Sequence, residues 1–149
     1  MNFFLALIGV TILIVGSNAF AAPITCRDTK TFAYGRMTVS EKQGDISIEF
    51  YSSVLSTFVD KLGLLGDLSY PTIELEFAKA DCTPLSVPFS CSGRGVRIVA
   101  VNLIDQGPAV NLGTLDFARV NLQNSGLAVA ATLGNASAQT NVPLTNCEP

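Results

Sequence analysis

Apolar and polar residues alternate with a period of two along most of this chain, and this alternation constrains its fold more than any other feature. In residues 46–51, large apolar side chains alternate with polar or aromatic ones, and the same pattern recurs in residues 73–77, 114–117 and 127–133. A period of two places successive side chains on opposite faces of a strand. Each segment is therefore predicted to be an antiparallel strand with one face on a core and the other in water.

Turn-forming residues separate these segments and support an all-β chain. Glycine, proline and asparagine occur at residues 43–45, 92–95, 106–108, 124–126 and 134–135, where they favour the backbone angles of tight turns. Further strands are predicted at residues 32–39, 87–91, 96–104 and 138–144. Residues 96–104 are apolar on both faces apart from Arg97 and Asn102, as in a central strand covered on both sides. We predict an antiparallel β-sandwich or small barrel of seven or eight strands, and the sequence does not decide between the two.

One segment departs from this period. Six apolar residues follow helical spacing: Val54, Leu55, Phe58, Val59, Leu62 and Leu65. Ser56, Thr57, Asp60 and Lys61 would face the other way. The spacing predicts one short helix, from about Ser53 to Gly63, lying across an open edge or end of the sheets.

The four cysteines predict two disulfides. Cys26, Cys82, Cys91 and Cys147 lack the close C-x₂₋₄-C spacing of zinc ligands, and the chain contains no histidine. Prolines between Cys82 and Cys91 favour a compact turn, so we expect these two to pair and Cys26 to pair with Cys147. Consecutive pairing, Cys26 with Cys82 and Cys91 with Cys147, stays open.

The N-terminus has the pattern of a cleaved export signal. Residues 3–16 are apolar apart from Thr11 and lead to Ala19-Phe20-Ala21, which fits a signal-peptide core followed by an A-x-A cleavage site. The apolar run is shorter than the roughly 20 residues that span a membrane. We therefore predict a signal peptide at residues 1–21, a single all-β domain at residues 22–149, no stable membrane anchor, and an exported product, either secreted or periplasmic.

The distribution of charge argues against a nucleic-acid partner and identifies one long uncharged region. The formal net charge is −3, and no basic stripe of the kind that binds nucleic acid is present. Residues 120–147 carry no charged side chain at all. Because exposed strands usually carry charges that discourage edge-to-edge pairing, these strands are predicted to be interior to a sheet or to face a partner or ligand.

Few residues are candidates for chemistry. The absence of histidine excludes the common triads and dyads, and no nucleotide-binding or nucleophile-elbow motif occurs. Glu74 and Glu76, two apart on one predicted strand, have a spacing compatible with a carboxylate-based glycan hydrolase. Their simpler interpretation is the polar face of a strand. Asn135-Ala136-Ser137 is an acceptor sequence for N-glycosylation, and its use depends on the source.

These observations favour an exported, non-enzymatic binding or protein-interaction module, with no cofactor, no metal and no nucleic-acid partner. The partner is predicted to be an unknown protein or a small apolar ligand. Two alternatives stay open: a carrier of an apolar ligand, in which the predicted helix would act as a lid over a cavity, and the hydrolase based on Glu74 and Glu76.

Overall fold

The computed structural model describes residues 22–27, 36–51, 53–64, 72–101, 109–144 and 146–149. The predicted signal peptide lies outside these residues. The described parts of the chain form eleven strands, one α-helix and one turn of 3₁₀-helix. In chain order they are β1 Ile24–Arg27, β2 Arg36–Lys42, β3 Asp45–Tyr51, α1 Ser53–Lys61, β4 Thr72–Ala78, η1 Lys79–Asp81, β5 Phe89–Gly93, β6 Val96–Val101, β7 Val110–Leu115, β8 Phe117–Gln123, β9 Gly126–Leu133, β10 Ala136–Val142 and β11 Asn146–Glu148.

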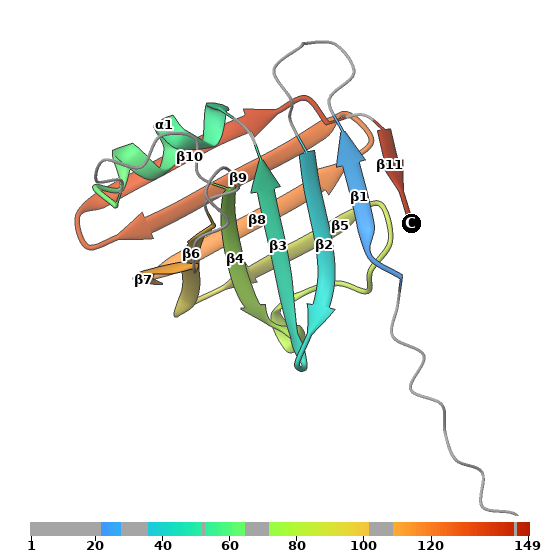
Figure 1. Cartoon of the computed structure of the whole chain (residues 1–149), viewed down its shortest axis with the longest axis horizontal. Helices are drawn as coiled ribbons and strands as arrows, with labels where there is room; N and C mark the ends of the chain where they lie inside the picture. Colours follow the sequence, from blue (N-terminus) through green and yellow to red (C-terminus); the bar gives the residue numbers. More distant parts are fainter. Residues whose placement is uncertain (1–21, 28–35, 52, 65–71, 102–108, 145) are drawn as a thin grey trace, which may run out of the picture.

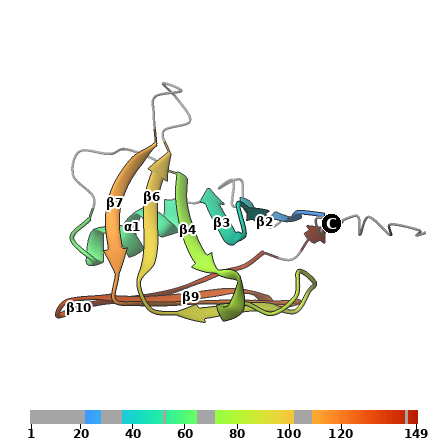
Figure 2. The same ribbon diagram turned by 90° about the horizontal axis from the view of Figure 1, so that it is seen from below.

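The strands form two antiparallel sheets. Seven strands pair in the order β11-β1-β2-β3-β4-β6-β7, and four pair in the order β10-β9-β8-β5. Figure 1 shows the strands of the two sheets crossing in projection, and Figure 2 shows the sheets as separate layers. The predicted all-β architecture with one short helix is confirmed, and the two layers give it the form of a sandwich.

The strand count exceeds the predicted seven or eight for a local reason. Residues 114–117 were expected to form one strand, but Asp116 is a bend between β7 in the larger sheet and β8 in the smaller one. The phase of the alternation changes there: Leu115 is buried, whereas on β8 the buried residues are Ala118, Val120 and Leu122. The other additional strands are the short β1 and β11.

Strand β6 also differs from its prediction. It lies between β4 and β7, one position from the edge of the seven-stranded sheet. Ile98 is fully buried on its inner side, but the side chain of Arg97 is 52% exposed on the outer side. The prediction that both faces are covered is therefore wrong at Arg97, and residues 102–104 lie outside the described part of the chain.

The core lies between the two sheets. Alternate residues of each strand point inward, as the period of two requires. The largest fully buried side chains come from both sheets, and among them are Phe50, Phe77, Phe89, Ile98 and Leu122.

Helix α1 covers one side of this core. It contacts β10, the edge strand of the smaller sheet, and lies beside β10 in both views (Figures 1 and 2). Phe58, Val59 and Leu62 are buried in the core, so the helix closes an edge of the sandwich, as its spacing predicts.

Two disulfides hold the chain, as predicted. Cys26 on β1 is bonded to Cys147 directly opposite on β11, with a sequence separation of 121. Cys82, just after η1, is bonded to Cys91 on β5, with a sequence separation of 9. Thr83 donates its backbone N–H to the Ser90 carbonyl at 2.8 Å, which continues the pairing beside the second bridge.

Candidate functional site

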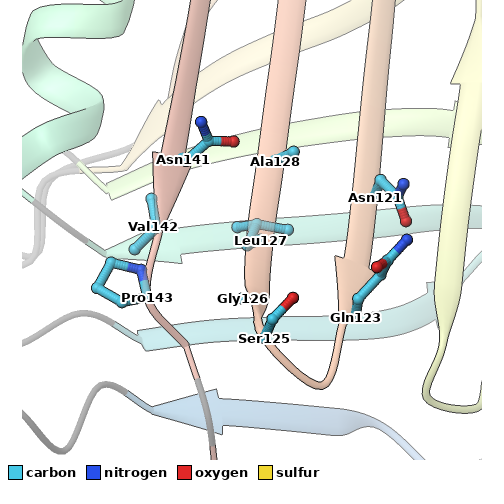
Figure 3. A pocket seen from close by; sticks show the side chains of 9 residues that line it. All are labelled: Asn121, Gln123, Ser125, Gly126, Leu127, Ala128, Asn141, Val142 and Pro143. Atoms are coloured by element: carbon cyan, nitrogen blue, oxygen red, sulfur yellow. The ribbon is translucent and has the colours of Figure 1, made fainter.

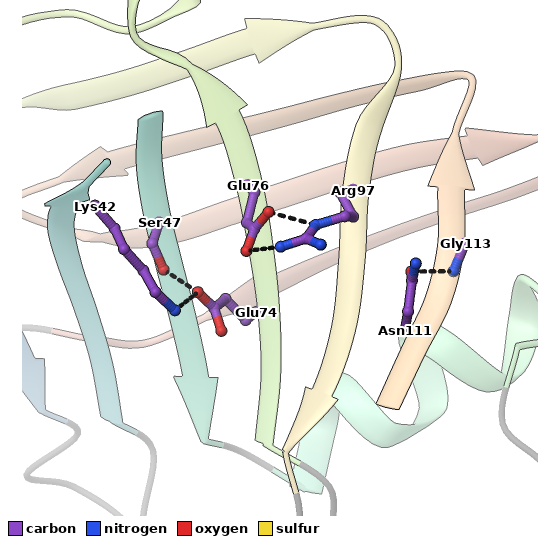
Figure 4. Close-up of polar contacts among 7 residues, drawn as sticks. All are labelled: Lys42, Ser47, Glu74, Glu76, Arg97, Asn111 and Gly113. Carbon is purple, nitrogen blue, oxygen red and sulfur yellow. Dashed lines mark hydrogen bonds and ion pairs between the residues drawn. The ribbon is translucent and has the colours of Figure 1, made fainter. Parts of the chain in front are cut away.

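Glu74 and Glu76 lie on the outer face of the seven-stranded sheet, and each carboxylate is bound by neighbouring side chains (Figure 4). The hydroxyl of Ser47 donates to Glu74 Oε1 at 2.5 Å, and Lys42 Nζ lies 3.4 Å from the same oxygen. Glu74 is only 7% exposed. Its carboxylate is therefore part of a packed polar cluster and presents little surface to a substrate.

Glu76 is held by a different partner. Arg97 donates from Nε and Nη2 to the two carboxylate oxygens of Glu76, each at 2.5 Å, which makes a two-bond fork. This hydrogen bonding by Arg97 lowers the pKa of Glu76 below its usual value. A general acid in glycoside hydrolysis requires a raised pKa, so the arrangement opposes that role for Glu76.

A hollow of about 460 Å³ adjoins this cluster. Its lining includes Lys42, Asp45, Ser47, Glu76 and Arg97. Because Arg97 and Lys42 already bind Glu76 and Glu74, their charges are largely compensated within the protein. The hollow therefore offers few uncompensated charges to an ionic ligand.

The outer face of the four-stranded sheet has a different composition. Its outward positions on β8, β9 and β10 carry amides, hydroxyls and alanines, and we call this surface the amide face. It comprises Phe117, Arg119, Asn121, Gln123, Ala128, Ala130, Thr132, Ser137, Gln139 and Asn141. Arg119 is its single charged residue, so the uncharged segment identified in the sequence forms most of one surface.

Strand register orders the amide face into rows. Ala128 pairs with Asn121 on one side and Asn141 on the other, and Ala130 pairs with Arg119 and Gln139 in the same way. Small side chains therefore run along the middle strand, with longer polar side chains on both sides. Because neighbouring strands lie about 4.8 Å apart, the Cα atoms of Asn121 and Asn141 are about 10 Å apart.

A groove of about 400 Å³ occupies one end of this face (Figure 3). Its lining includes Asn121, Gln123, Ser125, Ala128 and Asn141, and Figure 3 shows the amides of Asn121 and Asn141 on opposite sides of Ala128. Each amide both donates and accepts hydrogen bonds. The groove is thus suited to neutral, hydrogen-bonding groups.

An aromatic–cation pair lies farther along β8. The guanidinium carbon of Arg119 is 5.7 Å from the centre of the Phe117 ring, within the range of a cation–π contact. The sequence analysis did not identify this pair, because it predicted that Phe117 shares the buried face of Leu115. The sequence signal for this pair was the apolar side chains at residues 118, 120 and 122. Their period of two places residues 117 and 119 on the outer face.

The four candidate cysteines are structural. All four cysteines are in disulfides, and within the described ranges no three histidine, cysteine or carboxylate side chains gather as they would around a metal ion. Asn135 is exposed between β9 and β10. None of the helices described is both long enough and apolar enough to cross a membrane.

Comparison of the chain with protein-family models, with curated proteins and with solved structures finds no match.

Proposed function

We propose that this protein is an exported, non-enzymatic protein-interaction module that binds its partner through the amide face. The observation that carries this proposal is the contrast between the two sheets. The outer face of the larger sheet satisfies its charges internally, whereas the amide face presents amides and alanines around one Arg–Phe pair.

Export is supported by two independent features. The two disulfides are typical of proteins that work in an oxidising environment outside the cytosol. The apolar run and A-x-A sequence of residues 1–21 fit a cleaved secretory signal.

A protein partner is supported by the composition of the amide face. The cores of protein interfaces are depleted in Lys, Glu, Asp, Ser and Ala and enriched in aromatic residues and Arg. The support therefore comes from Phe117, Arg119 and the lack of Lys, Glu and Asp, and not from the alanines. Arg119 and Phe117 lie side by side here, and Arg and aromatic side chains often dominate binding energy. The uncharged surroundings would allow a partner to approach without removing water from further charges.

The size of the face indicates the kind of complex. Strand β9 has 8 residues, so the face measures about 25 Å along the strands and about 15 Å across three of them. This footprint is about half of the ~800 Å² that each partner contributes to a standard interface. We therefore expect a transient complex unless the partner also reaches α1 or β5.

The two alternative functions have less support. A carrier would need an apolar cavity, yet Phe50, Phe77 and Phe89 are among the large side chains that fill the space between the sheets. A hydrolase based on Glu74 and Glu76 would need a free acid, and Arg97 binds Glu76 through both oxygens.

The test compares one inserted charge on each outer face. Ala128→Lys places an ammonium in the middle of the amide face, and Thr38→Lys places the same group at a half-buried outward position on β2. Tagged wild-type protein and both variants are used to capture partners from extracellular or periplasmic material of the source. The captured protein is then produced separately, and its affinity for each form is measured.

The expected result is a single saturable protein partner whose affinity falls at least tenfold with Ala128→Lys and stays within twofold with Thr38→Lys. An equal effect of both variants would contradict the assignment of the amide face. A partner that is a lipid or a glycan would contradict the class of partner proposed.

A further inference from the structure

The turn between β9 and β10 presents an acceptor sequence for N-glycosylation at the tip of a hairpin. Leu133 pairs with Ala136, so Gly134 and Asn135 form a two-residue turn. Gly134 has a φ of 57°. Glycine at the first turn position is typical of type II′ hairpins, in which only that position needs a positive φ.

The side chains that define the acceptor sequence are accessible. Asn135 and Ser137 are both exposed, and a Cβ built at Gly134 would meet no atom within 4 Å. Asn135-Ala136-Ser137 is also the single Asn-x-Ser/Thr sequence in the chain. A bulky group on Asn135 would therefore extend into solvent.

The hairpin tip is held without the Asn135 side chain. The Asp116 carboxylate accepts the backbone N–H of Gly134 at 2.6 Å, and the Asp116 backbone N–H donates to the Thr132 carbonyl at 3.0 Å. Both contacts connect the turn to the corner between the sheets. Modification of Asn135 would leave them in place.

We propose that Asn135 is a site of N-linked glycosylation. The amide nitrogen Nδ2 of Asn135 attacks C1 of the first sugar of a lipid-linked oligosaccharide diphosphate. A new C1–N bond forms as the C1–O bond to phosphate breaks; the lipid diphosphate leaves with the bonding electrons, and Nδ2 loses one proton. No oxidant or reductant is needed.

A glycan at this position would protect an edge without covering the groove. Strand β10 is an edge strand of its sheet and carries no charged residue or proline, the residues that commonly protect edges from pairing with other chains. Helix α1 packs against this strand, and a glycan on Asn135, which precedes its first residue, would add bulk there. Leu133, next to the turn, is five residues from Ala128 along β9, about 17 Å at strand spacing. The sugar therefore lies away from the groove, at the end of the face where Phe117 pairs with Thr132.

The test uses the full chain secreted from a eukaryotic cell that performs N-glycosylation. Wild type is compared with Asn135→Gln and Ser137→Ala, which destroy the acceptor sequence, and with Ser137→Thr, which preserves it. Asn124→Gln is the matched control, because Asn124 is exposed in the turn between β8 and β9. Intact mass is measured before and after peptide N-glycosidase treatment.

We expect heterogeneous added mass on wild type, Ser137→Thr and Asn124→Gln, removed by the enzyme with conversion of the modified asparagine to aspartate. Asn135→Gln and Ser137→Ala should carry none, with both disulfides still formed in non-reducing peptide maps. Secreted wild type with the unmodified mass would overturn the proposal. The readout is intact mass and not binding, so the result does not depend on the proposed interaction function, although Ser137 itself belongs to the amide face.

Discussion

The outer faces of the two sheets use polar residues in opposite ways. On the larger sheet, Glu74 and Glu76 are bound by Ser47, Lys42 and Arg97 across β2, β3, β4 and β6 (Figure 4). On the smaller sheet, amides and alanines leave a groove open to solvent (Figure 3). On the larger sheet the charged side chains bind one another, whereas on the smaller sheet the amide side chains face solvent and can bind another molecule. The contacts of the larger sheet contribute to stability, and we propose that the smaller sheet provides the surface for recognition.

The largest expected effect on stability comes from removing the disulfides. They can be compared directly because each sheet contains one. Loop-entropy estimates give about 5 kcal/mol for a bridge closing 121 residues and about 2.5 kcal/mol for one closing 9. Replacing Cys26 and Cys147 together by serine should therefore lower the free energy of unfolding about twice as much as replacing Cys82 and Cys91. Urea unfolding of both double variants measures this. A larger loss for the Cys82 and Cys91 variant would show that the smaller sheet depends more on its bridge.

The next-largest expected effect on stability comes from a buried carboxylate on the larger sheet, which we compare with a half-buried amide on the smaller sheet. Glu74→Ala removes the charged acceptor of the Ser47 hydroxyl and should cost about 2 kcal/mol. Removing Glu74 also relieves its like-charge pairing with Glu49, directly opposite on β3, which keeps the loss at this level. Asn121→Ala on the amide face should change stability by less than about 0.5 kcal/mol.

A double-mutant cycle sharpens this prediction. If the Ser47–Glu74 hydrogen bond causes the loss, Ser47→Ala combined with Glu74→Ala should cost clearly less than the two single losses added together. Additive losses, or an Asn121→Ala variant as destabilised as Glu74→Ala, would break the proposed division between the two faces.

The smallest effect concerns pH and is confined to the larger sheet. Arg97 lowers the pKa of Glu76, so the folded state binds a proton at this carboxylate less readily than the unfolded state does. The resulting stabilisation is present above the usual glutamate pKa and is lost as pH falls through the lowered value. Glu76→Gln should therefore show a smaller loss of stability than wild type between neutral pH and about pH 3.

Urea midpoints across this range provide the measurement, and Arg97→Gln is the matched control because it removes the same pair from the other side. Both variants should show the same weaker response to acid. If Arg97→Gln retained the wild-type response, another cause would have to be sought for the lowered pKa of Glu76.

Local pattern was sufficient to predict which residues point inward. The alternation of Ile46, Ile48 and Phe50 placed them in the core, and all three are buried there. The helical spacing around Phe58 and Val59 likewise predicted α1 and its buried side. These features follow from the sequence because side-chain direction in a strand or helix depends only on the local backbone period.

Sheet membership was decided by the tertiary structure. Leu115 and Phe117 look like neighbours on one strand face, but Asp116 bends the chain between the sheets and turns Phe117 toward Arg119. The partners of Glu74 and Glu76 come from strands that are distant in sequence, and so do the two amides beside Ala128. The sequence by itself therefore determined the all-β class, the single helix and the uncharged segment of residues 120–147. Long-range strand pairing decided the rest, because no local period encodes it. It placed the uncharged segment on the outer face of the smaller sheet and placed the carboxylates beside their partners on the outer face of the larger sheet.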